Sequence, residues 1–205
     1  MSPDPFPPPL RLRPASADPA DYLAADEVID HHHPGIRALA VRLRCDSAEN
    51  SARAAFEYVR DRVAHSADVG RWSAAYRASD VLAAGDAICH GKSHLLTAVL
   101  RAQGIPAGLC YQRFDVLHAL IAVHWPQPRG GGSWVRLDPR GNKPGVDAQF
   151  TTDPAGERLA WPVDPGRGEF EYATVYPATP AVLREALAAA RPDREGYGYY
   201  LPVEL

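Results

Sequence analysis

The sequence has few cysteines, no long apolar run and no excess of one charge sign. Three cysteines in 205 residues form an odd set without disulfide-framework spacing, which excludes a disulfide-stapled scaffold and favours the reducing cytoplasm. No run approaches the ~18 apolar residues of a membrane-spanning helix, so we expect no membrane partner. The formal net charge of −3 provides no basic surface for a nucleic acid partner.

The first residues also lack a basic region followed by an apolar stretch, so no secretory signal is predicted. The remaining composition is that of an ordinary globular protein, with 46% hydrophobic and 23% charged residues. The length suits one domain with a full core. We expect an extended, proline-rich arm over residues 1–20, one folded domain over 21–190 and a tail over 191–205.

Helical periodicity dominates the first half of the sequence. The predicted helices span residues 34–44, 47–65, 79–84, about 87–103 and, near the end of the chain, about 180–190. Pro34 suits a first helical position, and Ser47 suits an N-cap. Gly104 and Pro106 are the expected stop for the 87–103 helix.

After Pro106 the apolar pattern changes from period 3.6 to period 2, which predicts strands. These strands span residues 107–114, 117–125 and 133–138, and a hairpin loop over 126–132 joins the last two. Residues 10–13 are a candidate edge strand, and 146–178 read as short strands or coil. The order predicts an α+β fold in which N-terminal helices and the 87–103 helix pack on an antiparallel sheet.

Cys89 lies in the first turn of the 87–103 helix. Free N–H groups and the helix dipole favour a thiolate there. Asp86 is a candidate N-cap whose charge would instead raise the pKa of the thiol. Because Cys89 shares a helical stripe with Ser93 and Leu96, it could also be a plain core residue. A nearby base is therefore needed to argue for a nucleophile.

The second predicted strand supplies two candidate bases, His118 and His124, which share a face because they are six residues apart. Asp138 ends the third strand, and the hairpin brings it alongside the second. A contact between His118 and Asp138 would orient the imidazole as a base for Cys89. Trp72 and Tyr76, in the connection before the cysteine, are candidate walls of a substrate cleft.

Other histidines raise the possibility of a metal site. His90 and His94 are four residues apart, which places two imidazoles on one helix face, but no glutamate lies between them and zinc needs further ligands. We interpret them, with Lys92, as a polar surface. His31, His32 and His33 are adjacent, so their side chains diverge. No metal or other cofactor is expected.

Three motifs in order resemble the transglutaminase-like superfamily, which has a papain-like fold and a Cys–His–Asp triad. They are the helix that opens at Cys89, with Gly-Ile-Pro-Ala beginning fifteen residues later, then His118-Ala119 opening a strand, and Trp134 to Pro139 as W-x-x-x-D-P. Longer runs, CHGKSHLLTAVLRAQGIPAGLCYQRF and RLDPRGNKPGVDAQF, are similar to bacterial transglutaminase-like proteins. The resemblance covers roughly residues 20–190. Departures from the family pattern are Ala87, Gly108, Leu120 and Arg140.

The resemblance implies that Cys89 is the nucleophile, that His118 is the general base and acid, and that Asp138 orients His118. His124 then becomes a cleft or core histidine. The implied activity is acyl transfer through a thioester on a peptide, protein or small amide, and we expect hydrolysis rather than cross-linking. The alternative is a peptide-binding module on the same fold with a weakly ionised Cys89.

Overall fold

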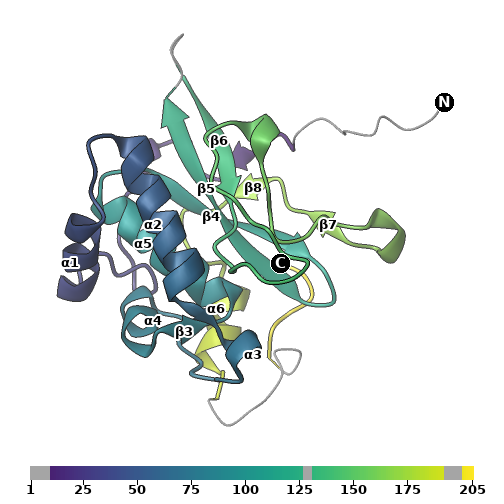
Figure 1. The fold of residues 1–205 in the computed structure, drawn as a ribbon. Coiled ribbons are helices and arrows are strands. Elements are labelled where there is room, and N and C mark those ends of the chain that lie inside the picture. The colour runs from purple at the N-terminus through teal and green to yellow at the C-terminus, as the bar shows by residue number, and fades with distance from the viewer. Residues whose placement is uncertain (1–9, 127–130, 192–199) are drawn as a thin grey trace.

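The structure is a computed structural model that describes residues 10–126, 131–191 and 200–205. Several helices surround one central helix, and a four-stranded sheet lies against it (Figure 1). The helices are α1 (Pro34–Arg42), α2 (Ala48–Arg62), α3 (Ser66–Val69), α4 (Ala78–Ala84), α5 (Cys89–Ala102) and α6 (Ala181–Ala188). The strands are β1 (Arg13–Pro14), β2 (Ala64–His65), β3 (Asp86–Ala87), β4 (Ala107–Arg113), β5 (Leu117–Pro126), β6 (Gly132–Leu137), β7 (Phe170–Glu171) and β8 (Thr174–Val175).

Local sequence signals explain where the longer helices begin and end. Pro34 occupies the first helical position of α1, where its missing N–H costs no helical hydrogen bond. The Ser47 hydroxyl accepts a hydrogen bond from the Asn50 N–H at 3.0 Å and caps α2. Gly104 follows α5 with a φ of +81°, a left-handed conformation that glycine adopts without strain. The five predicted helices are confirmed, with bounds that differ by a few residues.

The main sheet has the order β6-β5-β4-β7, and its neighbouring strands are antiparallel. The three predicted strands are its three long members. Strands β5 and β6 form the predicted hairpin, since Pro126 pairs with Gly132. Residues 127–130 of the predicted hairpin loop lie outside the described part of the chain. The predicted α+β class, with helices ahead of an antiparallel sheet, is confirmed.

Two short parallel pairs connect distant segments. Strand β2 pairs with β3, and β1 pairs with β8 near the other end of the chain. The expected edge strand at residues 10–13 was therefore displaced, because only Arg13 and Pro14 pair. The Tyr22 hydroxyl strengthens this junction by donating to the Val175 carbonyl at 3.0 Å.

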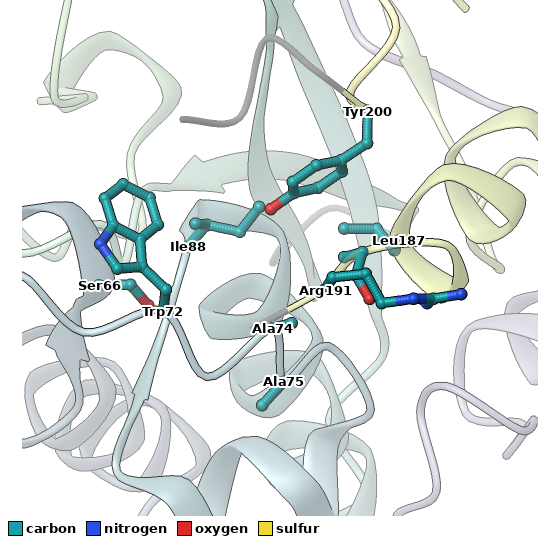
Figure 2. Close-up of a pocket in the computed structure, with 9 residues that line it drawn as sticks. Ser66, Trp72, Ala74, Ala75, Ile88, Leu187, Arg191 and Tyr200 are labelled. Atoms are coloured by element: carbon teal, nitrogen blue, oxygen red, sulfur yellow. The ribbon is translucent and has the colours of Figure 1, made fainter. Parts of the chain in front are cut away.

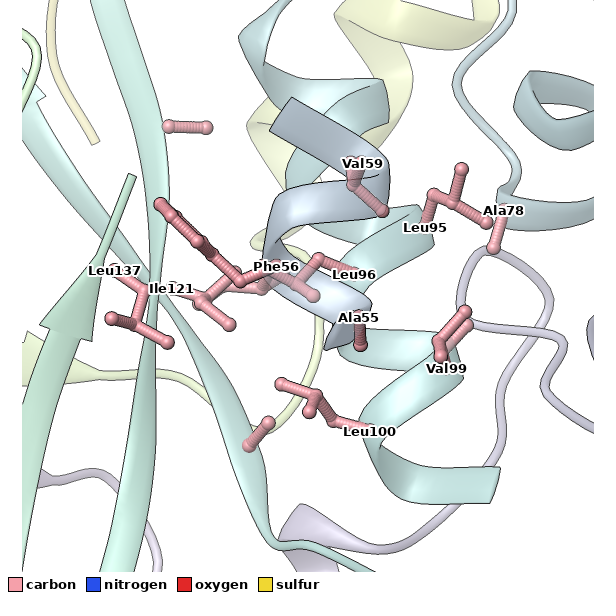
Figure 3. Packing of buried hydrophobic residues seen from close by; sticks show 14 of the residues in the cluster. Ala55, Phe56, Val59, Ala78, Leu95, Leu96, Val99, Leu100, Ile121 and Leu137 are labelled. Carbon is pink, nitrogen blue, oxygen red and sulfur yellow. The ribbon is translucent and has the colours of Figure 1, made fainter. Parts of the chain in front are cut away.

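The hydrophobic core surrounds α5. Figure 3 shows side chains of α2 and α5 packed together, with Ile121 and Leu137 of the sheet on one side and Ala78 of α4 on the other. The core residues labelled in Figure 3 are Leu95, Leu96, Val99 and Leu100 of α5, with Ala55, Phe56, Val59, Ala78, Ile121 and Leu137 around them. Every residue of α5 from Cys89 to Arg101 is buried. The helix that begins at the cysteine is therefore held on all sides.

The prediction of a polar surface at His90, Lys92 and His94 is wrong, because all three side chains are fully buried. The central position of α5 leaves it no solvent face. The Lys92 ammonium donates to the Arg60 carbonyl at 3.2 Å and to the Val63 carbonyl. It thus satisfies carbonyls at the C-terminal end of α2 that have no helical partner. Burial lowers the pKa of Lys92 to about 7.

Residues 200–205, the C-terminal segment, lie along the sheet rather than away from it. The Leu117 N–H donates to the Pro202 carbonyl at 3.3 Å, and Arg113 forms an ion pair with Glu204 at 3.2 Å. Leu201 is buried. The rest of the predicted tail, residues 192–199, lies outside the described residues. Among the helices of the described residues, none is long and apolar enough to cross a membrane.

Candidate active site

Cys89 is the first residue of α5. Its N-cap is Ile88, in an extended conformation, and no side chain caps the helix. The expected cap by Asp86 was wrong, because Asp86 lies in β3 and its carboxylate accepts a hydrogen bond from the Ser66 hydroxyl at 2.8 Å. The N–H groups of the first turn therefore remain available to an anion near the sulfur. The Cys89 side chain also accepts from the Ala119 N–H at 3.5 Å.

The register of β5 and β6 brings His118 to Asp138. Ile121 pairs with Leu137, so the same register continued by one step would set Leu120 opposite Asp138. His118 then lies diagonally across on the same face. Its Nε2 is 2.8 Å from Asp138 Oδ2, and both side chains are buried. The contact expected from the sequence is present.

Asp138 is fixed by hydrogen bonds on both oxygens. Its Oδ1 accepts from the Arg140 N–H at 3.0 Å, and its Oδ2 accepts from the Ala160 N–H at 3.0 Å in addition to His118. The Arg140 guanidinium forms an ion pair with Asp68 of α3 and lies 5.2 Å from the Trp161 ring centroid. Arg140, one of the departures from the family pattern, therefore connects α3 to the turn that carries Asp138.

Electrostatics favour a charged cysteine–histidine pair. Burial alone would raise the pKa of the Cys89 thiol, but interactions with His90 and His118 and hydrogen bonds with His118 and His65 hold it well below its usual value. Burial acts to lower the pKa of His118, and the charges and hydrogen bonds of Asp138 and Cys89 raise it to about 10. Because Asp138 engages Nε2, Nδ1 is the nitrogen available to the sulfur.

A cleft of about 290 Å³ opens at Cys89. Its walls are mainly apolar and aromatic, which suits an uncharged substrate side chain. The lining residues are His65, Ile88, Cys89, Phe114, Asp115, Val116, Leu117, His118, Trp161 and Leu201. Two of the three triad candidates therefore reach the cleft, and Asp138 lies behind His118.

Trp72, a predicted cleft wall, lines a neighbouring cavity of about 10 Å³ instead. Figure 2 shows this cavity, with the Tyr200 ring extending over Ile88 between Trp72 and Leu187. Ile88 lines both the cavity and the cleft. The structure therefore places Trp72 beside the Cys89 cleft, not in it.

The structure does not bring Tyr76 or His124 to the cleft. Tyr76 packs on the core, and its carbonyl accepts a hydrogen bond from His94. His124 contacts Trp134, with ring centroids 5.1 Å apart. Six residues of extended strand separate it from His118 by about 20 Å. A shared strand face therefore did not mean a shared site.

Sequence reasoning missed several cleft residues. His65 reaches Cys89 through a pair of two-residue strands, which are too short to show a period. Trp161 comes from a segment without regular structure, and its ring stands edge-on to His118 at 5.3 Å. Leu201 comes from the far end of the chain. His65 was assigned to the end of the predicted 47–65 helix, so the sequence did not indicate that it reaches Cys89.

The two histidines of α5 contact other groups of the protein. His94 contacts the Tyr76 carbonyl at 2.8 Å and the Thr179 hydroxyl at 3.1 Å, and His90 Nδ1 is 3.4 Å from the Cys89 sulfur. The two rings therefore do not converge on one ion. In the part of the chain that the structure describes, no group of three or more His, Cys, Asp or Glu residues is placed to hold a metal.

Comparisons with known proteins bear on the family and the fold. A family model described as the transglutaminase-like superfamily matches residues 37–139, half of the chain. A crystal structure described as a "putative cysteine protease" from Cytophaga hutchinsonii is similar in fold, with a TM-score of 0.50 and 19% identity. The similarity covers 64% of this chain and 46% of that one, so this chain spans about half the length of that protein. A search of curated proteins found no significant match.

Proposed function

Because the chain belongs to the transglutaminase-like superfamily, we propose that it catalyses acyl transfer from amide bonds through a thioester on Cys89, with water as the usual acceptor. The family and the protease-like neighbour support cysteine-based acyl transfer or hydrolysis as the general class. The observation that carries the proposal is the 2.8 Å contact between His118 and Asp138 beside a buried thiol of lowered pKa.

In the proposed reaction the Cys89 thiolate attacks the amide carbonyl carbon. The carbonyl π electrons move to oxygen, where the Cys89 N–H at the helix start stabilises the charge. The intermediate collapses, the C–N bond breaks, and protonated His118 gives its proton to the leaving amine. Water then gives a proton to His118 and attacks the thioester. Cleavage of the C–S bond yields a carboxyl product and restores the thiolate.

Asp138 has a positioning role in this proposal. Its two backbone hydrogen bonds hold the carboxylate still, and the carboxylate fixes the His118 ring and stabilises the imidazolium. The apolar cleft favours a peptide, a protein segment or a small amide with an uncharged side chain. The three free cysteines are in keeping with the cytoplasm as the proposed location.

We expect His118→Ala to lower the acylation rate of Cys89 by about 10²–10⁴-fold, the usual contribution of general acid–base catalysis, with the fold retained. The measurement is the burst of p-nitroaniline from acetyl p-nitroanilide, an amide whose leaving amine needs the proton of His118, followed by mass spectrometry of the Cys89 peptide. Cys45, which is exposed, and Cys110, which is buried with a pKa raised to about 12 by burial, serve as internal controls.

Release of the acetyl group distinguishes the two acceptors. Hydrolysis predicts that the acyl-enzyme decays at the same rate with and without methylamine, whereas transamidation predicts faster decay and an N-methylacetamide product. An unchanged burst in His118→Ala would contradict the catalytic assignment. A Cys89 that is neither acylated nor alkylated faster than Cys45 at pH 6 would favour the peptide-binding module.

A further inference from the structure

Besides His118 and His90, a third imidazole contacts the Cys89 side chain. His65 ends β2 and pairs across to Ala87 of β3, two residues before the cysteine. The pairing directs its side chain to the cleft, where it lines the wall with Cys89 and His118. A hydrogen bond joins the His65 imidazole to the cysteine side chain. The reaction proposed above has no role for this ring.

Hydrogen bonds on both sides of His65 fix its backbone. The Ala64 N–H donates to the Gly85 carbonyl at 3.0 Å, and the Ser66 hydroxyl donates to Asp86 at 2.8 Å. Both acceptors belong to the segment that leads into α5. The His65 imidazole and the Cys89 side chain therefore belong to one hydrogen-bonded unit. Such a unit is rigid, as a preorganised hydrogen-bond donor must be.

His65 and His118 differ in charge at the sulfur. Burial lowers the pKa of His65, although the hydrogen bond and charge of Cys89 oppose it; Arg140 lowers it further and Asp68 raises it. His118 has Asp138 as a partner and a raised pKa. At neutral pH His65 is therefore neutral, and a neutral imidazole still donates one N–H hydrogen bond.

We propose that His65 is a further catalytic residue, a neutral N–H donor to the Cys89 sulfur in the resting enzyme and to the carbonyl oxygen in the tetrahedral intermediate. When the sulfur bonds to the carbonyl carbon, the negative charge moves to an oxygen two bonds away, within reach of a donor already directed at the sulfur. The inference rests on the proposed acyl transfer and adds a side-chain donor to the Cys89 N–H.

Two reactions of the Cys89 thiolate distinguish an oxyanion donor at His65 from a residue that only supports the structure. Alkylation by iodoacetamide builds no oxyanion, whereas acylation by p-nitrophenyl acetate does. We would measure both against pH in the wild type, in His65→Gln, which keeps an N–H donor, and in His65→Met, which does not. His32→Gln, at an exposed histidine, is the matched control. Circular dichroism checks the fold of each variant.

For His65→Met we expect the midpoint of the alkylation profile to rise by about one pH unit, because one hydrogen bond to the thiolate is lost. On the high-pH plateau, where Cys89 is fully ionised, alkylation should match the wild type while acylation falls by about 10²-fold, the usual cost of one oxyanion donor. His65→Gln should retain most of the acylation, and His32→Gln all of it.

Equal losses of alkylation and acylation on the plateau, or no loss of either, would overturn the role of His65. Should His65→Met fail to fold, His65→Gln decides, and an acylation loss as large as about 10²-fold counts against the inference. The proposed function fails separately: in that case the wild type itself shows no rapid alkylation below pH 7 and no acylation burst.

Discussion

Asp138 sets the pH range over which His118 stays protonated. Its charge and hydrogen bond raise the pKa of His118 against the effect of burial. In Asp138→Asn only burial and Cys89 still act on the pKa of His118, so we expect this pKa to fall. The alkaline limb of the acylation profile, which follows the protonated His118, should therefore move to lower pH. The acid limb should move to higher pH, because a less stable imidazolium stabilises the thiolate less.

The measurement is the pH profile of Cys89 acylation by acetyl p-nitroanilide, whose leaving amine needs a proton, with Asp153→Asn, at an exposed carboxylate, as the control. The two limbs should approach each other in Asp138→Asn and stay in place in Asp153→Asn. A profile of unchanged width in Asp138→Asn would mean that this carboxylate has no electrostatic effect on the site.

At single residues, sequence reasoning succeeded where a motif fixed the spacing. Cys89, His118 and Asp138 were expected to meet, and the hairpin register brings the last two into contact. It failed where position depended on the tertiary environment. His90 and Lys92 look like surface residues in sequence, but they are buried because helices and sheet enclose α5. Nothing in the local sequence indicated that these two side chains are buried.

Gly91 lets the first turn of α5 approach its neighbours closely. A Cβ at this position would lie 2.7 Å from the Ala75 carbonyl oxygen, 2.7 Å from the Ala87 Cβ and 2.9 Å from a Val81 methyl. We expect Gly91→Ala to lower the free energy of unfolding by about 1–3 kcal/mol, as overpacked cores do, and to slow Cys89 alkylation because α5 must shift. Urea denaturation and iodoacetamide labelling measure the two effects.

Gly35 in α1 is the matched control. The nearest atom to a Cβ there is His33 Nδ1 at 3.3 Å, the end of an exposed side chain, so Gly35→Ala should be neutral or stabilising. If Gly91→Ala is as stable and as reactive as the wild type, then close packing at Gly91 does not position the cysteine.

Ion pairs hold α3 to the turn that carries Asp138. Hydrogen bonds from Arg140 and Lys143 hold the pKa of Asp68 far below its usual range. A carboxyl group whose pKa is lower in the folded state contributes stability above its unfolded pKa of about 3.9 and loses it as the pH falls. We therefore expect Asp68→Asn to be less stable than the wild type at pH 7.

That difference should shrink as the pH falls below about 4, which urea unfolding at several pH values would show. Asp80→Asn is a suitable control, because its ion pair with Arg77 is exposed and worth little. A pH-independent difference between Asp68→Asn and the wild type would contradict the electrostatic explanation.

The length of each helix or strand decided whether the sequence could predict it. The long helices and the strands of the hairpin show several repeats of their period, and the structure confirms them. Strands β2 and β3 have two residues each, so neither shows a repeat. These short strands form only because the longer elements bring their backbones together, and they carry His65 to Cys89.

The C-terminal segment partly covers the cleft. Leu201 is 6% exposed and lines the cleft with Cys89. We expect Leu201→Ala to increase the alkylation rate of Cys89, and to do so more for a bulky maleimide than for iodoacetamide, because a larger reagent needs more of the opening. Stopped-flow labelling measures both rates.

Val203→Ala is the control in the same segment, since Val203 is 51% exposed and should not affect access. Equal rates in the wild type and Leu201→Ala would show that this side chain does not limit entry. The sequence predicted a tail in this region without a contact to the site. The division into an arm over 1–20, a domain over 21–190 and a tail over 191–205 stays a prediction.

The junction of β1 and β8 has a consequence for biosynthesis. Arg13 and Pro14 find their pairing partners only at Thr174 and Val175. At a translation rate of about 5–20 residues per second, the ribosome needs roughly 8–32 s to add the intervening stretch of about 160 residues. During that time the emerging N-terminal segment has no strand to join. Chaperones that bind nascent chains would therefore meet it unpaired, well after α1 and α2 have left the exit tunnel.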